Sequence, residues 1–245
     1  MAGVQRVRGQ GGCSGEVCGD VERQARGVVF DMDGLMVDTE PLQFAAFRRH
    51  LWDDYGLELS PEDVHAMVGH RIDENWRYLK ELYPVITGDI ETLVQRRDAI
   101  YRPILEAEAA PLPGVVELIA RLHGAGYRVG LASSSPYWQI NTVLDRLGTR
   151  PYFQAMASGE EVTESKPHPA IYLLIAQRLD LSPQTCLALE DSAPGVAAAK
   201  AAGMRCIAVP NAYTRDHDLS PADLILPSLA ADAALAAVDR LLLTT

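Results

Sequence analysis

Asp31 and Asp33 are separated by one residue and directly follow a short apolar run, Val28-Val29-Phe30. An uninterrupted apolar run predicts a strand that helices cover on both faces, as in a parallel sheet. Two carboxylates at the exit of a buried strand repel each other, and burying them is costly unless a cation lies between them. Because hard divalent cations prefer oxygen ligands, the two acids predict a metal-assisted reaction centre.

Polar side chains also follow three further apolar runs that have the character of buried strands. The carboxyl ends of parallel strands meet at one edge of a sheet, where ligands bind in open α/β folds. We therefore expect these side chains to lie close to Asp31 and Asp33. They are Ser133, Ser134 and Ser135 after the second strand, Lys166 in the loop after the third, and Glu190 and Asp191 after the fourth.

The acids in this set suit a Mg²⁺ site. Asp31 and Asp191 supply enough negative charge to hold the ion and leave positions for water and a phosphate oxygen. Glu190 is either a further ligand or a salt-bridge partner. Asp191 alone has an ordinary explanation as the N-cap of a helix, so only the coincidence of acids at separate strand exits favours a metal site.

The remaining polar groups suit the transfer of a phosphoryl group, whose charge builds on its equatorial oxygens. An ammonium, a hydroxyl and a backbone amide aimed at those oxygens would stabilise that charge. The candidates are Lys166, the Ser133 hydroxyl and the Ser134 amide. Each of the three is also typical of a polar turn or a solvated loop when taken alone.

The elements that position these groups alternate between strand and helix after residue 109. Repeated βα units predict a doubly wound, Rossmann-like parallel sheet, which the first strand must join. The stretch 41–108 shows only helical patterns, so we expect an α-helical cap inserted into an α/β core of residues 27–40 and 109–245. Asp38-Thr39-Glu40-Pro41 is expected to start the first helix of this insertion, with polar side chains available to cap it, and Trp52 and Trp76 to lie in its own core.

Composition limits the classes of function. The formal net charge of −11 and the pI of about 5.0 argue against nucleic-acid or membrane partners, which require basic surfaces. Four scattered cysteines favour neither a disulfide framework nor a zinc site, and they suit the reducing cytoplasm. Residues 1–26 lack the apolar core of a signal peptide and are expected to be a disordered leader. The oligomeric state stays open, a monomer included.

Four ordered motifs resemble the haloacid dehalogenase superfamily, in its branch with a helical cap inserted after the first strand. They are Asp31-Met32-Asp33-Gly34-Leu35-Met36-Val37-Asp38-Thr39, Ser133 after an apolar strand, Lys166 in Ser-Lys-Pro-His-Pro, and Leu189-Glu190-Asp191-Ser192-Ala193-Pro194-Gly195-Val196. The resemblance covers nearly the whole chain after the leader. Any one motif would be weak evidence, but four in this order are specific.

The resemblance implies a role for each motif. Asp31 is similar to the nucleophile that forms an aspartyl-phosphate. Asp33 is similar to the general acid and base, with its backbone carbonyl on the metal; an acid at this position is typical of phosphatases and mutases and argues against dehalogenation. The metal-binding acids would be Glu190 and Asp191, and the phosphate clamp would be Ser133 with Lys166.

The resemblance to sugar-phosphate phosphatases and β-phosphoglucomutase leaves two reactions open. In the mutase a His follows the Asp-Thr pair, whereas the matching residue here is Gln43, whose amide cannot take up a proton. Gln43 thus favours a phosphatase of a sugar phosphate or nucleoside-like monophosphate over a phosphohexomutase. A non-catalytic metal- or ligand-binding module is disfavoured because no motif residue is missing.

Cap residues are expected to choose the substrate. The segment Val68-Gly69-His70-Arg71 lies between two cap helices and would reach the cleft when the cap closes. Arg71 is the best candidate to contact an anionic or hydroxyl-rich leaving group. An isolated His70 is more typical of a surface loop, and Thr39 marks the hinge into the cap.

Overall fold

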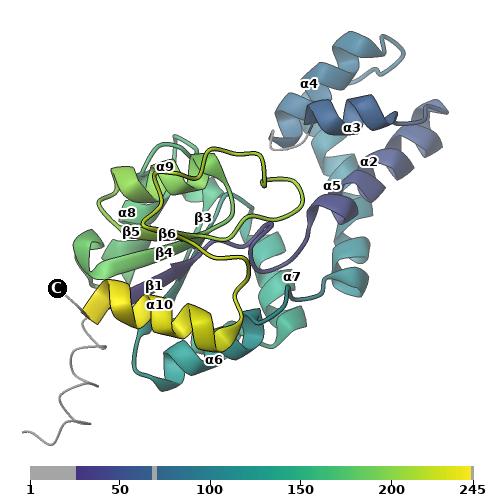
Figure 1. Cartoon of the computed structure of the whole chain (residues 1–245). Coiled ribbons are helices and arrows are strands. Elements are labelled where there is room, and N and C mark those ends of the chain that lie inside the picture. Colours follow the sequence, from purple (N-terminus) through teal and green to yellow (C-terminus); the bar gives the residue numbers. More distant parts are fainter. Residues whose placement is uncertain (1–25, 68–70, 244–245) are drawn as a thin grey trace, which may run out of the picture.

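The computed structural model describes residues 26–67 and 71–243. In this part of the chain six parallel strands form one sheet in the order β3-β2-β1-β4-β5-β6 (Figure 1). The strands are β1 (Gly27–Phe30), β2 (Arg128–Ser133), β3 (Ala155–Ser158), β4 (Cys186–Glu190), β5 (Arg205–Ala208) and β6 (Leu224–Ile225). The predicted doubly wound, Rossmann-like sheet is confirmed, with β1 in its middle between β2 and β4.

Helices cover both faces of this sheet. On one face lie α6 (Val115–Gly124), α7 (Tyr137–Leu147) and α10 (Ala231–Leu243), and on the other α8 (Ala170–Arg178) and α9 (Ala193–Ala201). Val28 and Phe30 of β1 join the hydrophobic cluster of the first face and Val29 joins that of the second. All three side chains are fully buried, which explains the apolar run without polar alternation. No helix in the described segments has the length and apolar character needed to cross a membrane.

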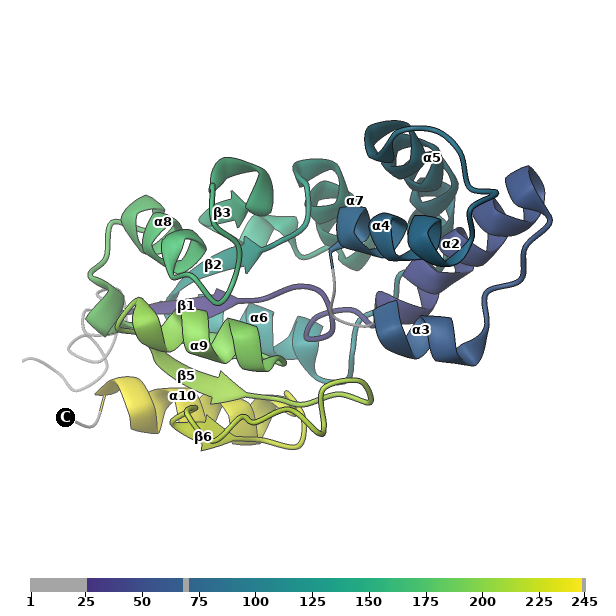
Figure 2. The same ribbon diagram turned by 90° about the horizontal axis from the view of Figure 1, so that it is seen from above.

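Four helices between β1 and α6 lie beside the sheet (Figure 2). They are α2 (Glu40–Tyr55), α3 (Pro61–Met67), α4 (Ile72–Leu82) and α5 (Ile90–Glu108). These helices enclose their own hydrophobic cluster, which contains Leu51 and the fully buried Trp76. The prediction that Trp52 also lies in this cluster is wrong, because its side chain is 58% exposed. Trp52 stands about 100° around α2 from the buried Leu51, outside the packed face.

The two chain connections between these helices and the sheet run side by side. Val37 forms an isolated bridge with Pro111, and the amide of Leu112 donates to the carbonyl of Met36 at 2.8 Å. The last turns of α5 pack into the main core through Tyr101. The helices are therefore attached to the sheet through adjacent segments, while the division of the chain into core and cap stays a prediction.

Candidate active site

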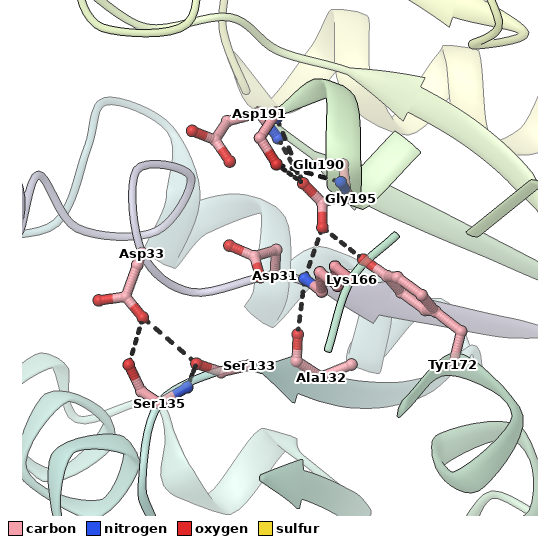
Figure 3. A network of polar contacts seen from close by, with 11 residues as sticks. Asp31, Asp33, Ala132, Ser133, Ser135, Lys166, Tyr172, Glu190, Asp191 and Gly195 are labelled. Carbon is pink, nitrogen blue, oxygen red and sulfur yellow. Dashed lines mark hydrogen bonds and ion pairs between the residues drawn. The ribbon is translucent and has the colours of Figure 1, made fainter. Parts of the chain in front are cut away.

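The end of β1 places Asp31 next to a buried lysine. The backbone amide of Asp31 donates to the carbonyl of Leu189 at 3.0 Å, so the pairing of β1 with β4 continues one residue beyond the strand. Lys166 reaches this point from the loop between β3 and α8, with Nζ 2.6 Å from Asp31 Oδ1 and 2.6 Å from Glu190 Oε1 (Figure 3). Asp31 is 6% exposed and Glu190 is fully buried. One ammonium thus neutralises part of the charge of two acids that lie shielded from water.

Both oxygens of Glu190 accept more than one hydrogen bond. Oε1 accepts from Lys166 and from the hydroxyl of Tyr172 at 2.7 Å. Oε2 accepts from the amides of Asp191 and Ser192 and from the Ser192 hydroxyl, at 3.0, 3.3 and 3.2 Å. A Cβ on Gly195 would lie 1.9 Å from this carboxyl group, so only glycine fits there. Glu190 therefore anchors Lys166 and the start of α9.

Asp191 does not cap the helix that follows it. The N-cap of α9 is Ser192, whose hydroxyl accepts from the Gly195 amide at 3.2 Å. One oxygen of the Asp191 carboxylate instead accepts from Asn211 Nδ2 at 2.7 Å, and the same nitrogen donates to the carbonyl of Gly34 at 3.0 Å. The ordinary explanation of Asp191 as a helix cap is thus excluded, and its side chain is held at the exit of the sheet.

Asp31, Glu190 and Asp191 form an acidic cluster that fits a divalent cation. Each offers a carboxylate oxygen, and these oxygens lie within 4.8 Å of one another. Burial raises the pKa of Asp31 to about 8, with Lys166 opposing the rise and Glu190 and Asp33 adding to it. Burial and the charge of Glu190 likewise raise the pKa of Asp191 well above its ordinary value. Three shielded acids with one lysine leave negative charge uncompensated, and an all-oxygen donor set matches Mg²⁺.

The carboxylate of Asp33 faces away from the acidic cluster and toward β2 and α7. Its Oδ1 accepts from the Thr39 hydroxyl at 2.7 Å and from Gln139 Nε2 at 2.8 Å. Its Oδ2 accepts from the hydroxyls of Ser135 at 2.7 Å and Ser133 at 3.3 Å (Figure 3). The helix α2 starts where the sequence predicts, but Thr39 at its N-cap position makes no side-chain capping bond. Its hydroxyl is used to orient Asp33 instead.

The two halves of the predicted phosphate clamp, Ser133 and Lys166, lie at the same edge of the sheet. Lys166 Nζ lies 3.5 Å from the carbonyl of Ala132, the residue before Ser133. The Ser133 hydroxyl accepts from the Ser135 amide at 3.0 Å and donates to Asp33. Ser134 is exposed directly after β2. Ser133 and Lys166 thus flank the exit of β1, one beside Asp33 and the other beside Asp31.

The predicted cap residues occupy different surroundings. Gln43 is partly buried on α2, where its Oε1 accepts from Arg97 Nη2 at 2.7 Å. Arg71 is exposed, pairs with Asp73, and donates from Nη1 to the Ser165 hydroxyl at 3.1 Å, one residue before Lys166 in the chain. His70 lies outside the described residues. Arg71 therefore joins the start of α4 to the loop that carries the buried lysine.

Ser135 lies beside Asp33, as its place after the second strand predicts. Three further residues of this network were not predicted: Gln139, Tyr172 and Asn211. Asn211 closely follows the apolar strand β5, so the rule used for the other strand exits could have found it. Gln139 and Tyr172 lie inside helices, and no pattern in the sequence separates them from ordinary helical residues.

Comparisons with known proteins agree on one family. The model of the haloacid dehalogenase-like hydrolase family matches residues 28–209. Hexitol phosphatase B of Escherichia coli (strain K12) is 39% identical over 192 residues, covering 77% of this chain and 85% of that protein. Fructose-1-phosphate phosphatase YqaB of the same strain is 35% identical over 191 residues, covering 77% and 97%. The crystal structure of CbbY from Rhodobacter sphaeroides in complex with phosphate has a TM-score of 0.77 at 30% identity, covering 88% and 99%.

Proposed function

The chain belongs to the haloacid dehalogenase-like hydrolase family, and from this premise we propose that it is a Mg²⁺-dependent phosphatase of sugar phosphates. It is a hydrolase that acts on phosphate esters. The observation that carries the proposal is the lysine ammonium held 2.6 Å from two buried carboxylates at the sheet exit, beside a third acid. A buried cation beside clustered acids suits a phosphoryl group and a divalent cation together.

In the proposed reaction an oxygen of Asp31 attacks phosphorus, and the bond from phosphorus to the sugar oxygen breaks. Asp33 enters this step as a carboxylic acid, turns toward the departing oxygen and gives it the proton, so that the sugar leaves as an alcohol. Asp33 then takes a proton from water, which attacks the aspartyl-phosphate and releases inorganic phosphate with Asp31 restored as a carboxylate. Lys166 favours the ionised form of Asp31 that attacks, because its ammonium opposes the rise in the pKa of that carboxyl group.

The remaining residues orient these groups. Mg²⁺, held by Asp31, Asp191 and the Asp33 carbonyl, would polarise the phosphate and offset the charge that builds on it. Glu190 keeps Lys166 beside Asp31 through the shared ammonium. The hydroxyls of Thr39 and Ser135, with the side-chain amide of Gln139, hold the Asp33 carboxylate toward β2 and α7 before it turns to the substrate.

We further propose that residues 41–108 act as a cap that closes over the sheet exit. Support comes from their separate hydrophobic cluster and from the adjacent pair of chain connections at Val37 and Pro111, which suits a hinge. The contact of Arg71 with Ser165 joins the two parts when the cap is closed. Closure would exclude water from the phosphoryl group until the leaving alcohol departs.

Two relatives support a sugar phosphate as the substrate, since one is named a hexitol phosphatase and the other a fructose-1-phosphate phosphatase. Gln43 favours hydrolysis over isomerisation, because its amide cannot serve as a second proton carrier. Sugar phosphates are therefore preferred here over nucleoside monophosphates and over the mutase reaction.

The test is a screen of the full chain with Mg²⁺ against hexose, ketose and hexitol phosphates, with nucleoside monophosphates as the comparison class. We expect inorganic phosphate from at least one sugar or sugar-alcohol phosphate, with a higher kcat/KM than for any nucleotide. Phosphorus NMR of the same reactions separates the mutase alternative. An isomerised sugar phosphate that forms without free phosphate would contradict the proposal, as would activity confined to nucleotides.

A further inference from the structure

A buried arginine lies at the junction between α2 and α5. The side chain of Arg97 is 1% exposed, and its guanidinium carbon lies 4.2 Å from the centroid of the Tyr101 ring and 5.2 Å from that of Phe47. Nη1 donates to Asp98 at 2.9 Å, whereas Nε is buried without a hydrogen-bond partner. Shielding a guanidinium from water is costly unless its contacts compensate. Such a residue calls for a role beyond packing.

The third contact of Arg97 fixes the orientation of an amide. Its Nη2 donates to Gln43 Oε1 at 2.7 Å. Arginine has five donors and no acceptor, so an amide beside it must turn its oxygen toward the guanidinium. This chemical requirement decides between the two orientations of the amide, which differ only by exchange of oxygen and nitrogen. The NH₂ group of Gln43, with its two donors, therefore points away from Arg97.

Gln43 lies one helical turn beyond the residue that orients the proposed general acid. The backbone N–H of Gln43 donates to the Thr39 carbonyl at 2.9 Å, and the Thr39 hydroxyl donates to Asp33. Residues four apart share one face of a helix. Tyr101, whose ring lies against the Arg97 guanidinium, is fully buried with an unpartnered hydroxyl, and burial together with the charge of Asp33 raises its pKa. Polar groups thus continue from Asp33 along the junction to Arg97.

We propose that Arg97 is a positioning residue for substrate specificity, which locks the Gln43 amide so that its NH₂ donates to a hydroxyl oxygen of the leaving sugar. The inference rests on the proposed function and deepens it. The hydrogen bond from the Gln43 amide would select substrates with a hydroxyl near the ester oxygen, as in phosphorylated sugars and sugar alcohols. An aryl phosphate such as p-nitrophenyl phosphate has no such hydroxyl and gains nothing from the contact.

The experiment compares KM and kcat for fructose-1-phosphate and sorbitol phosphate with those for p-nitrophenyl phosphate. Arg97→Met frees the amide to rotate, and Gln43→Glu keeps an acceptor for Arg97 but removes both donors. For each variant we expect KM for the sugar substrates to rise about tenfold relative to KM for p-nitrophenyl phosphate, the value of one hydrogen bond. Since Arg97 acts through Gln43, the double variant should lose no more than about twofold beyond Gln43→Glu alone.

Arg96→Met is the matched control, because Arg96 is the neighbouring arginine of α5 and pairs with Asp54 on the surface. It should leave the ratio of the two KM values unchanged. Equal losses on sugar and aryl substrates would overturn the inference, as would fully additive effects in the double variant. If Arg97→Met does not fold, Arg97→Gln replaces it in the single and double variants, because an amide both donates and accepts and so does not fix the Gln43 amide. Wild-type protein that releases phosphate from no sugar phosphate would instead refute the proposed function.

Discussion

Asp31 and Glu190 stand at the ends of β1 and β4, whose backbones pair in register from Gly27 with Cys186 to Phe30 with Leu189. The separation of these two acids is therefore set by hydrogen bonds of the sheet. Gln43 and Arg97, by contrast, meet from two helices, and their contact depends on how α2 packs against α5. Backbone pairing is tolerant of side-chain change, whereas a helix packing contact shifts with the residues between the helices.

This contrast suggests different roles for two regions: the sheet exit, where Asp31 and Glu190 follow their strands, and the α2–α5 junction, where Gln43 meets Arg97. In the proposed reaction, groups at the sheet exit carry the chemistry that is common to phosphate esters, because they address only the phosphoryl group and its charge. Groups at the α2–α5 junction would address the leaving alcohol, which differs between substrates. Variants at the sheet exit should therefore reduce the turnover of every substrate, and variants at the α2–α5 junction should change the ranking of substrates.

Asp31→Asn should have the largest effect, because an amide oxygen cannot serve as the attacking group. We expect kcat to fall by about 10⁴-fold or more for sugar and aryl phosphates alike, as measured by phosphate release. The fold should persist, since the change removes one of three clustered acids. A loss restricted to sugar substrates would contradict the assignment of this region to common chemistry.

Removal of Mg²⁺ should abolish activity. It should also make the free energy of unfolding fall as the pH rises. The pKa of Asp31 rises from 3.8 to about 8 on folding, so the folded metal-free protein binds more protons than the unfolded chain between these values. Its free energy of unfolding should therefore fall as pH rises through that window.

Mg²⁺ binds the ionised acids, so the stabilisation that it provides should grow over the same pH range. Melting temperatures from pH 5 to 8, with Mg²⁺ or with EDTA, measure both trends. Metal-free protein that gains stability toward pH 8 would contradict the acidic cluster as a cation site.

Lys166→Met should destabilise the protein, because it leaves Asp31 and Glu190 buried without their shared cation. Breaking a buried ion pair in this way costs about 3–5 kcal/mol in the free energy of unfolding. Lys200→Met is the control, since Lys200 pairs with Asp223 at a partly exposed site and should cost less than about 1 kcal/mol. Urea denaturation of both variants gives the two losses in free energy of unfolding. Equal losses would refute the claim that Lys166 stabilises two buried acids.

Arg71→Ala should have the smallest effect. Arg71 and Arg77 both pair with Asp73, but only Arg71 also reaches Ser165. We expect KM for sugar phosphates to rise about threefold in Arg71→Ala, with stability changed by less than about 0.5 kcal/mol because the side chain is exposed. Arg77→Ala is the matched control and should leave KM unchanged; an equal rise in both variants would remove Arg71 from the cap contact.

The sequence allowed prediction of the groups that follow strands, because parallel strands bring their ends to one edge whatever the details of packing. Asp31, Lys166 and Glu190 meet there for that reason. The α2–α5 junction was not predictable in the same way. Arg96 and Arg97 are adjacent and chemically identical, yet one pairs at the surface and the other is buried against two aromatic rings. Only the packing of α5 separates them.

The orientation of individual side chains could not be predicted from the sequence either. Thr39 has the residue type and position of a helix cap, but its hydroxyl donates to Asp33 because the turn after β1 brings that carboxylate within 2.7 Å. Gln139 reaches the same carboxylate from the first turn of α7. Such contacts follow from the relative placement of elements far apart in the chain, which local patterns do not encode.

The central claim, that Asp31 becomes phosphorylated during turnover, is tested most directly by trapping the intermediate. The protein is mixed with a sugar phosphate that it hydrolyses, and the reaction is quenched in acid during turnover. Borohydride then reduces any aspartyl-phosphate to homoserine, which mass spectrometry locates in the chain. We predict homoserine at position 31 in wild-type protein, and none in protein without substrate or in Asp31→Asn. Rapid turnover with homoserine at another aspartate, or at none, would contradict the account.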